Sequence, residues 1–175
     1  LAEEHGLAIH AHRAMHAAFT RNPRHGISMF VLAKLLRTIG VDQLHVGTPG
    51  VGKLEAKTRD VVNYARVLGE KHFTPEPGDE FHMEQEWHHI KPALPVSSGG
   101  LHPGTLPDVI KAMGVDLVIQ VGGGVIGHPD GPRAGAAAVR QAIEAAIKGI
   151  PLQEYAEQHR ELRRALEKWG FVKPV

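Results

Sequence analysis

The chain has 175 residues, of which 42% are hydrophobic and 22% charged, with a formal net charge of +1 and no cysteine. This length suits one globular domain with a proper core, and the near-zero charge points to neither nucleic acid nor a membrane surface as a partner. The lack of cysteine excludes disulfides and thiolate metal sites, and fits the cytoplasmic location that we expect.

Short apolar segments and amphipathic helical patterns alternate along the chain. Strands are predicted at 6–11, 41–46, 93–97 and 116–121. Helices are predicted at 29–39, 54–68, 105–113 and 132–148, with one or two charged helices over 152–169. Residues 71–91 show no helical or strand periodicity and are predicted to form an exposed irregular segment. Four successive β-α units predict a parallel sheet with helices outside it.

Local signals mark the ends of these predicted helices. Ser28 is a plausible N-cap for the helix from Met29, and Gly40 follows its end. Thr105 occupies the cap position of a later helix, Pro132 opens the last long one, and Gly149 follows its end. For the helix over 29–39, spacing predicts a buried apolar face. The residues of this face are Val31, Leu32, Leu35, Leu36 and Ile39.

The loops rich in glycine all follow strands, at their C-terminal ends. The first, from Gly47 to Glu55, carries Lys53, which suits either a mobile lid over an anion or a solvated βα turn. The others are Ser98-Gly99-Gly100 and the run 122–124. Barrel enzymes place their chemistry at this end of the strands, and glycine loops after the last two strands suit a phosphate site. Simple turns are the alternative. A complete (β/α)₈ barrel needs roughly 200 residues, so four units indicate half of one.

Histidines gather after the first predicted strand and at the end of the second. His10, His12 and His16 could form a metal site, but Arg13 among them would repel a cation. A general base or a hydrogen-bonding role is favoured, with a purely structural role fitting His10 best. Arg13 and His45 suit a second phosphate, with plain surface charge as the alternative.

A second group of histidines lies in the aperiodic stretch. It consists of His82, Glu84, His88 and His89. These side chains read as solvated, and a metal site is the alternative.

Several segments occur in the order seen in one known family. They are 12–17, 25–27, the loop 47–55, 95–102, 120–124 and 127–129. In this combination the chain resembles the large subunit of ribulose-1,5-bisphosphate carboxylase/oxygenase (RuBisCO). The sequences of segments 19–26 and 128–135 resemble the archaeal (form III) branch of this family more than the plant branch. The resemblance covers nearly the whole chain.

The resemblance implies a role for individual residues. His12 would accept a proton in the later steps, and Lys53 would close over the substrate and stabilise the developing carboxylate. Arg13 and His45 would hold one substrate phosphate. The remaining expected substrate-binding residues are Ser98, Gly99, Gly100, Gln120, Val121, Gly122 and Gly123.

The resemblance also implies a fold and an activity. The chain would be the second half (strands five to eight) of a TIM barrel over residues 1–150, with 151–175 as a C-terminal helical extension of the same domain. The activity would be that of a carbon–carbon lyase that carboxylates ribulose 1,5-bisphosphate with CO₂, and O₂ would be an alternative substrate. The protein would form a homo-oligomer built from dimers. Mg²⁺ would be the cofactor, with its ligands, including a carbamylated lysine, upstream of this chain.

Two other functions stay open. A RuBisCO-like enolase or isomerase of a sugar phosphate usually replaces several of the carboxylase residues that are present here. A non-catalytic half-barrel would lack the metal centre, and we expect the isolated chain to be inactive. An open half-barrel would expose parallel-sheet edges, so alone it should associate or be marginally stable.

Overall fold

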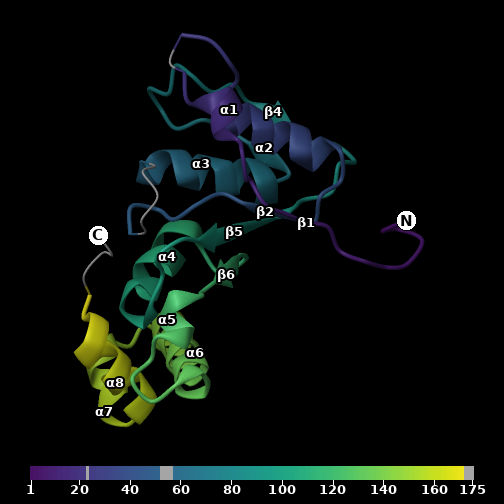
Figure 1. Cartoon of the computed structure of the whole chain (residues 1–175). Helices are drawn as coiled ribbons and strands as arrows, with labels where there is room; N and C mark the ends of the chain where they lie inside the picture. Colours follow the sequence, from purple (N-terminus) through teal and green to yellow (C-terminus); the bar gives the residue numbers. More distant parts are fainter. Residues whose placement is uncertain (23, 52–56, 172–175) are drawn as a thin grey trace. The chain divides into compact units, whose positions relative to one another are not determined.

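The computed structural model describes residues 1–22, 24–51 and 57–171, which divide into two compact units (Figure 1). The first unit comprises 1–46 and 59–96, and the second 47–58 and 97–175. In the described part of the chain, no helix is long and apolar enough to cross a membrane.

The strands confirm the predicted parallel α/β arrangement. They follow the order β1-β2-β5-β6, in which β1 pairs with β2 and β2 with β5, both in parallel. The bounds are His10–Ala11 for β1, Gln43–His45 for β2, Leu94–Ser98 for β5 and Val118–Gln120 for β6. Strands β1, β2 and β6 are shorter than their apolar segments. Backbone pairing still continues beyond two of these strands, since Gln43 N–H donates to the Ile9 carbonyl and Val46 N–H to the Val96 carbonyl.

Besides its parallel strands, the first unit contains helices and one hairpin. The helices are α1 (Ala17–Thr20), α2 (Met29–Thr38) and α3 (Thr58–Gly69), and the hairpin is β3 (His72–Phe73) with β4 (Gln85–Glu86). Ser28 caps α2 as predicted, since its hydroxyl accepts the Val31 N–H at 3.3 Å. Helix α3 covers Thr58–Gly69, and its predicted start at position 54 lies outside the described residues. The antiparallel hairpin corrects the aperiodic reading of 71–91.

The predicted buried face of α2 is wrong in part. Val31, Leu35 and Ile39 are exposed, whereas the helix buries Met29, Phe30, Ala33 and Arg37. Arg37 turns inward because its guanidinium finds backbone acceptors there. It donates to the carbonyls of Val67, Glu70, Ile90 and Lys91.

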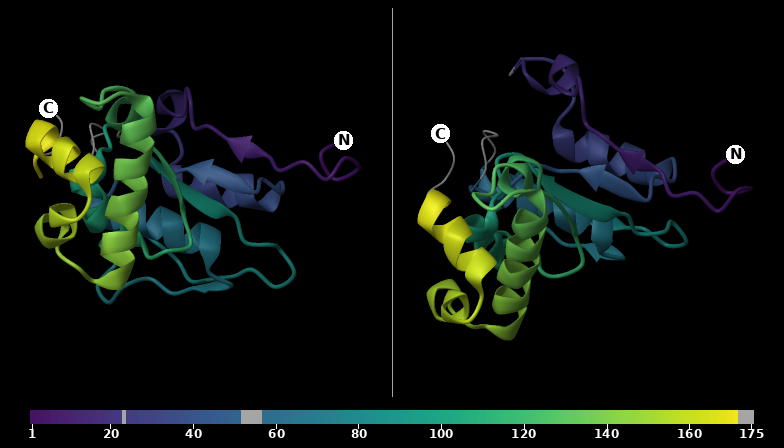
Figure 2. Two further views of the ribbon diagram at one scale, coloured as in Figure 1. Left: turned by 90° about the horizontal axis from the view of Figure 1, so that it is seen from below. Right: turned by 60° about the horizontal axis from the view of Figure 1, so that its bottom comes forward.

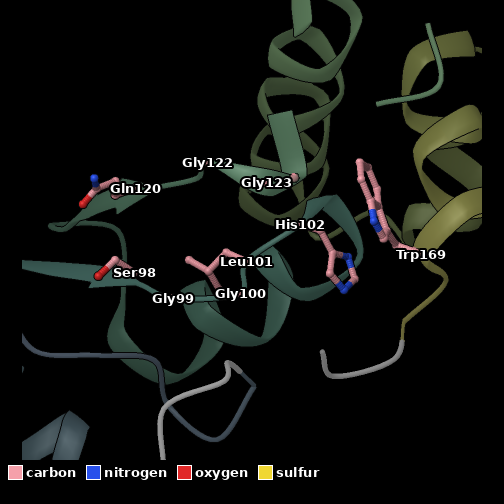
Figure 3. A pocket seen from close by; sticks show the side chains of 10 residues that line it. Ser98, Gly99, Gly100, Leu101, His102, Gln120, Gly122, Gly123 and Trp169 are labelled. Atoms are coloured by element: carbon pink, nitrogen blue, oxygen red, sulfur yellow. The ribbon is translucent and has the colours of Figure 1, made fainter. Parts of the chain in front are cut away.

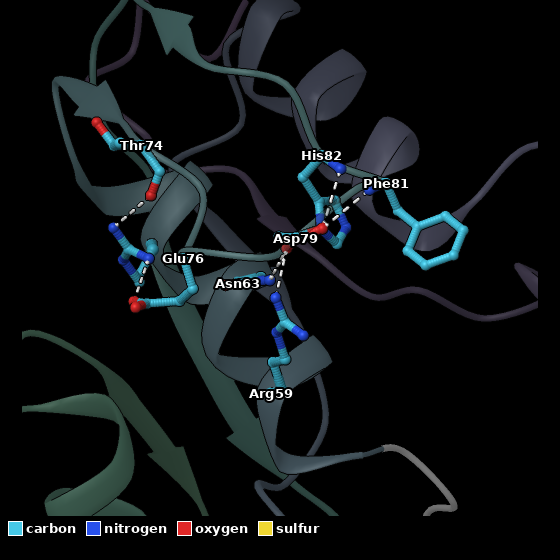
Figure 4. Close-up of polar contacts among 8 residues, drawn as sticks. Arg59, Asn63, Thr74, Glu76, Asp79, Phe81 and His82 are labelled. Atoms are coloured by element: carbon cyan, nitrogen blue, oxygen red, sulfur yellow. Dashed lines mark hydrogen bonds and ion pairs between the residues drawn. The ribbon is translucent and has the colours of Figure 1, made fainter.

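A buried carboxylate ties the loop before β4 to α3 (Figure 4). Asp79 accepts the backbone N–H groups of Phe81 and His82 at 3.0 and 3.2 Å, and the ring Nδ1 of His82 lies 2.8 Å from it. Arg59 and Asn63 of α3 reach the same carboxylate at 3.2 and 3.4 Å. Hydrogen bonding from the His82 ring, followed by the two backbone bonds, lowers the pKa of Asp79 to about 2.

This low pKa predicts an acid-sensitive first unit. A carboxyl whose pKa is lower in the folded state stabilises the fold fully above its unfolded pKa, and that stabilisation is lost as the pH falls towards the folded pKa. Between about pH 4 and pH 2, the free energy of unfolding should therefore fall more steeply in the native chain than in Asp79→Asn. Urea titrations at several pH values measure this. Parallel pH profiles for the two proteins would contradict it.

The second unit is mainly helical and has its own apolar core. After β5 come the 3₁₀ turn η1 (Pro103–Thr105), α4 (Leu106–Met113), α5 (Gly123–Ile126), α6 (Pro132–Lys148), α7 (Leu152–Glu157) and α8 (Arg160–Trp169). Figure 2 shows α8 lying alongside α6. Pro132 opens α6 and left-handed Gly149 ends it, as predicted. Leu106, Val109, Ala142 and Leu162 are fully buried in this core.

Candidate functional site

The glycine loops after β5 and β6 line one cavity in the second unit, here called the glycine pocket (Figure 3). Its volume is about 540 Å³. The lining residues are Ser98, Gly99, Gly100, Leu101, His102, Gln120, Gly122, Gly123, Gly124 and Trp169. Six of the seven second-unit residues predicted to bind substrate are among them. Val121 is the exception, because its side chain packs against the apolar core.

The local backbone explains why glycine follows Ser98. Gly99 and Gly100 have φ angles of +108° and +71°, in the left-handed region where a Cβ is strained. Two such residues in succession turn the chain sharply from β5 towards η1. A bend of this kind brings backbone groups to a cavity wall without intervening side chains, which suits contact with an anion.

A close backbone approach joins the two loops of the glycine pocket. A Cβ added to Gly124 would lie 2.5 Å from the Leu101 carbonyl oxygen and 2.8 Å from the His102 Cα, so only glycine fits there. Thr105 has the cap position that the sequence predicts, but its hydroxyl donates to the His102 carbonyl and accepts the His102 N–H instead of capping α4. The Thr105 bonds therefore fix the loop after β5 internally, while the close approach at Gly124 sets the loop after β6 against it.

Helix α8 contributes a pocket residue that sequence reasoning missed. Trp169 stacks on the ring of His102, with 5.9 Å between centroids and 23° between planes (Figure 3). It lies 67 residues after His102 in the sequence, and its helix shows only a charged amphipathic pattern. No local signal connects it to a glycine loop.

The predicted residues of the first unit gather at the ends of β1 and β2. His10, His12 and His45, with Arg13 beside them, form what we call the histidine cluster. The Nε2 atoms of His10 and His45 lie 2.8 Å apart, and the rings of His12 and His45 have centroids 4.4 Å apart. His16 instead pairs with Thr20 in α1.

Burial and neighbouring charge keep His45 neutral. Only 3% of its surface is exposed. Desolvation, followed by the nearby His12, His10 and Arg13, lowers the pKa of His45 to about 4. A neutral imidazole at physiological pH hydrogen-bonds through one N–H and one lone pair, and gains positive charge only when an anion stabilises it.

Arg13 supplies the lasting positive charge of the histidine cluster. It is half-buried, and desolvation lowers its pKa, an effect that nearby Tyr64 of α3 opposes. Arginine stays protonated in proteins despite such shifts, and its planar fork suits two oxygens of a phosphate.

The loop holding His12 has an unusual backbone. Met15 has φ +64° although it is not glycine, a conformation typical of functional loops. The Nδ1 atom of His12 accepts the Ala14 N–H at 3.0 Å, so the neutral ring carries its proton on Nε2. In this conformation His12 is a donor. To accept a proton, as the resemblance implies, its ring must release Ala14.

The described residues do not form a site suited to Mg²⁺. Across 1–22, 24–51 and 57–171, no group of three or more His, Asp or Glu side chains could hold a metal ion. His82 pairs with Asp79, and Glu84 with His72, instead of with the other members of their predicted group. The histidine cluster offers ring nitrogens beside a guanidinium, whereas Mg²⁺ takes oxygen ligands. Lys53 lies outside the described residues.

Parallel strands with polar and glycine-rich loops at their carboxyl ends define a class of α/β proteins that bind ligands at that edge. Within this class, the chain belongs to one family: residues 1–169 match the model of the ribulose bisphosphate carboxylase large chain, catalytic domain. The family resemblance found in the sequence is therefore confirmed, and the archaeal relatives named next confirm its archaeal character.

Individual relatives support this assignment. The chain is 67% identical over all of its 175 residues to a ribulose bisphosphate carboxylase of Thermococcus onnurineus. It is 65% identical to the dimeric archaeal Rubisco of Hyperthermus butylicus, with a TM-score of 0.91 over 98% of the chain. It is 53% identical to the octameric Rubisco of Pyrococcus horikoshii, with a TM-score of 0.84 over 97% of the chain. The chain spans 39%, 39% and 37% of the lengths of these three relatives, respectively.

Proposed function

We propose that this chain is the substrate-gripping part of a ribulose-bisphosphate carboxylase. It corresponds to strands five to eight of the barrel over residues 1–150, with 151–175 as a helical extension of the same domain. The observation that carries the proposal is the glycine pocket, because the loops after two strands enclose one cavity lined by glycines and short polar groups.

Each group of residues has a physical task in this proposal. The glycine pocket would take one substrate phosphate through the backbone N–H groups of Gly122 and Gly123, with Ser98 and Gln120 beside it. The histidine cluster would take the other through Arg13 and His45. His12 would exchange protons with the substrate, and Lys53 would stabilise the carboxylate that forms.

The remaining parts of the enzyme are proposed to lie elsewhere in a longer protein. The Mg²⁺ ligands, including a carbamylated lysine, belong there, since the described residues do not suit the ion. The protein would work on CO₂ or O₂ in the cytoplasm, as a homo-oligomer built from dimers. Two solved relatives, described as dimeric and octameric, support the oligomer.

A chimera tests this function directly. This chain would replace the matching segment of the Thermococcus onnurineus relative, and ribulose-bisphosphate-dependent incorporation of labelled bicarbonate into acid-stable product would be measured with Mg²⁺. We expect incorporation by the chimera and none by this chain alone. A folded chimera without incorporation would refute the proposal. It would favour a RuBisCO-like isomerase if the sugar phosphate is converted, and a non-catalytic half-barrel if it is not.

A second prediction concerns the binding of bisphosphate in the glycine pocket. A Cβ added to Gly123 meets nothing within 4 Å, so Gly123→Asp should fold normally while placing a negative charge beside the phosphate. Repulsion of about 1.4 to 2.8 kcal/mol should weaken bisphosphate binding roughly tenfold to a hundredfold. Calorimetric titration of the chimera measures it. Gly123→Ala tests for bulk alone, and equal losses in both variants would contradict the electrostatic explanation.

A further inference from the structure

A short series of hydrogen bonds leads into the histidine cluster from Gln43, the first residue of β2. Gln43 and His45 lie two residues apart on β2, so their side chains share one face of the strand. His10 on β1 is in register with Gln43. The Gln43 Oε1 atom lies 2.6 Å from the His10 Nδ1, and the His10 Nε2 lies 2.8 Å from the His45 Nε2.

Proton counting gives this series a direction. An amide oxygen only accepts, so the Nδ1 atom of His10 must carry a proton. A neutral imidazole has one N–H, which leaves the Nε2 atom of His10 as an acceptor. The Nε2 atom of His45 must then be the donor. Each bond in the series fixes the protonation of the next ring.

The surroundings favour neutral rings in this series. His45 is faced by His10 on β1 and by His12 and Arg13 just after it, all of which disfavour a second positive charge. On the α3 side, Tyr64 acts on Arg13, and Asp60 acts on Tyr64.

We propose that Gln43 and His10 are positioning residues that hold His45 with its proton on Nε2. The series fixes both the ring orientation and the tautomer of His45, as a partner of the second ring nitrogen does for histidines that bind metals. The role of the anion rests on the proposed function, whereas the tautomers do not.

The consequence is that anion binding and protonation are linked. A phosphate beside His45 stabilises its charged form, so binding takes up a proton. Binding becomes tighter as the pH falls through the raised pKa of the complex towards the ligand-free pKa of about 4. Without Gln43, His10 can carry its proton on Nε2 and point an N–H at His45. The bond between the two rings can then run in the opposite direction, with His45 protonated on Nδ1, so the tautomer of His45 is no longer fixed.

Nitrogen NMR of ¹⁵N-histidine-labelled protein tests the proposal, because protonated and bare ring nitrogens resonate far apart. In the native chain we expect His10 protonated on Nδ1, the less common tautomer of free histidine, and His45 protonated on Nε2. Gln43→Leu should shift His10 towards Nε2 protonation. The matched control is His16→Leu, which removes a neighbouring ring that pairs with Thr20 and should leave both tautomers unchanged.

The native spectrum alone can overturn the proposal, without any variant. Protonation of His10 on Nε2 would mean that the series runs in the opposite direction. Unchanged His10 and His45 tautomers in folded Gln43→Leu would mean that Gln43 positions nothing.

Titration with inorganic phosphate tests the proposed phosphate role of His45 separately from the tautomers of His10 and His45. We expect Gln43→Leu to bind phosphate about tenfold more weakly and with less pH dependence than the native chain. If phosphate leaves the native His45 signals unchanged, the proposed phosphate role of His45 is wrong, while the tautomers still decide the role of Gln43 and His10.

Discussion

Replacing Lys53 by alanine should lower carboxylation by the chimera about a hundredfold to a thousandfold, the usual loss when one preorganised electrostatic group is removed. Lys53 is the one lysine of a loop with three glycines and a proline, next to a strand whose last residue is His45. A cation on such a loop can move onto the substrate as negative charge develops. The loss should appear in kcat, since the interaction strengthens in the transition state.

The matched control is Lys57→Ala, which removes the next lysine along the chain. Lys57 is exposed and precedes α3, so its loss should change turnover by less than about threefold. Lys53→Arg keeps the charge but changes its shape, and should recover only part of the activity. Labelled-bicarbonate incorporation by folded chimeras measures all three. Turnover by Lys53→Ala within tenfold of the parent would show that Lys53 is not the stabilising cation.

The element order could be predicted from the sequence because it depends on local signals. Ser28, Pro132 and Gly149 mark helix ends by their own backbone and side-chain chemistry, and each is found where expected. The short hairpin of β3 and β4 could not be found in this way. Its strands have two residues each, and Phe73 is the one fully buried apolar side chain among them. Alternation cannot be recognised over two residues.

Burial was harder to predict, and α2 shows the reason. Spacing alone favours Val31, Leu35 and Ile39 as the inner face, whereas Arg37 reads as an outward-facing charge. Its inward orientation depends on carbonyls at the end of α3 and just before β5, some 30 to 54 residues away. Periodicity depends on the sequence of the helix alone, so it cannot include acceptors supplied by distant segments.

In the candidate site, too, some residues could be predicted from local sequence signals, whereas others depend on contacts between distant segments. The residues of the glycine pocket follow two strands directly, and strand ends can be read from the sequence. Trp169 joins the pocket through the packing of α8, and Gln43 joins the histidine cluster through strand register. Both connections exist only once elements far apart in sequence are paired, so neither residue stood out.

Arg37→Met should lower the free energy of unfolding of the first unit by about 3 to 5 kcal/mol. Arg37 is 1% exposed, and the distances from its nitrogens to the four carbonyl oxygens are 2.7 to 3.3 Å. Its guanidinium also lies over Trp87, 4.2 Å from the ring centroid. Methionine fills similar space but donates nothing, so buried carbonyls at the end of α3 would lose their partners.

Urea denaturation in a Trp169→Phe background measures this loss, because Trp87 is then the one tryptophan of the chain and reports on the first unit. The matched control is Arg140→Met. Arg140 is also hydrogen-bonded, to Glu144, but its side chain is 82% exposed, so its loss should cost about 0.5 kcal/mol or less. Arg37→Lys should lie between, since one ammonium cannot reach all four carbonyls. A loss below about 1 kcal/mol in Arg37→Met would mean that water satisfies these carbonyls as well as the guanidinium does.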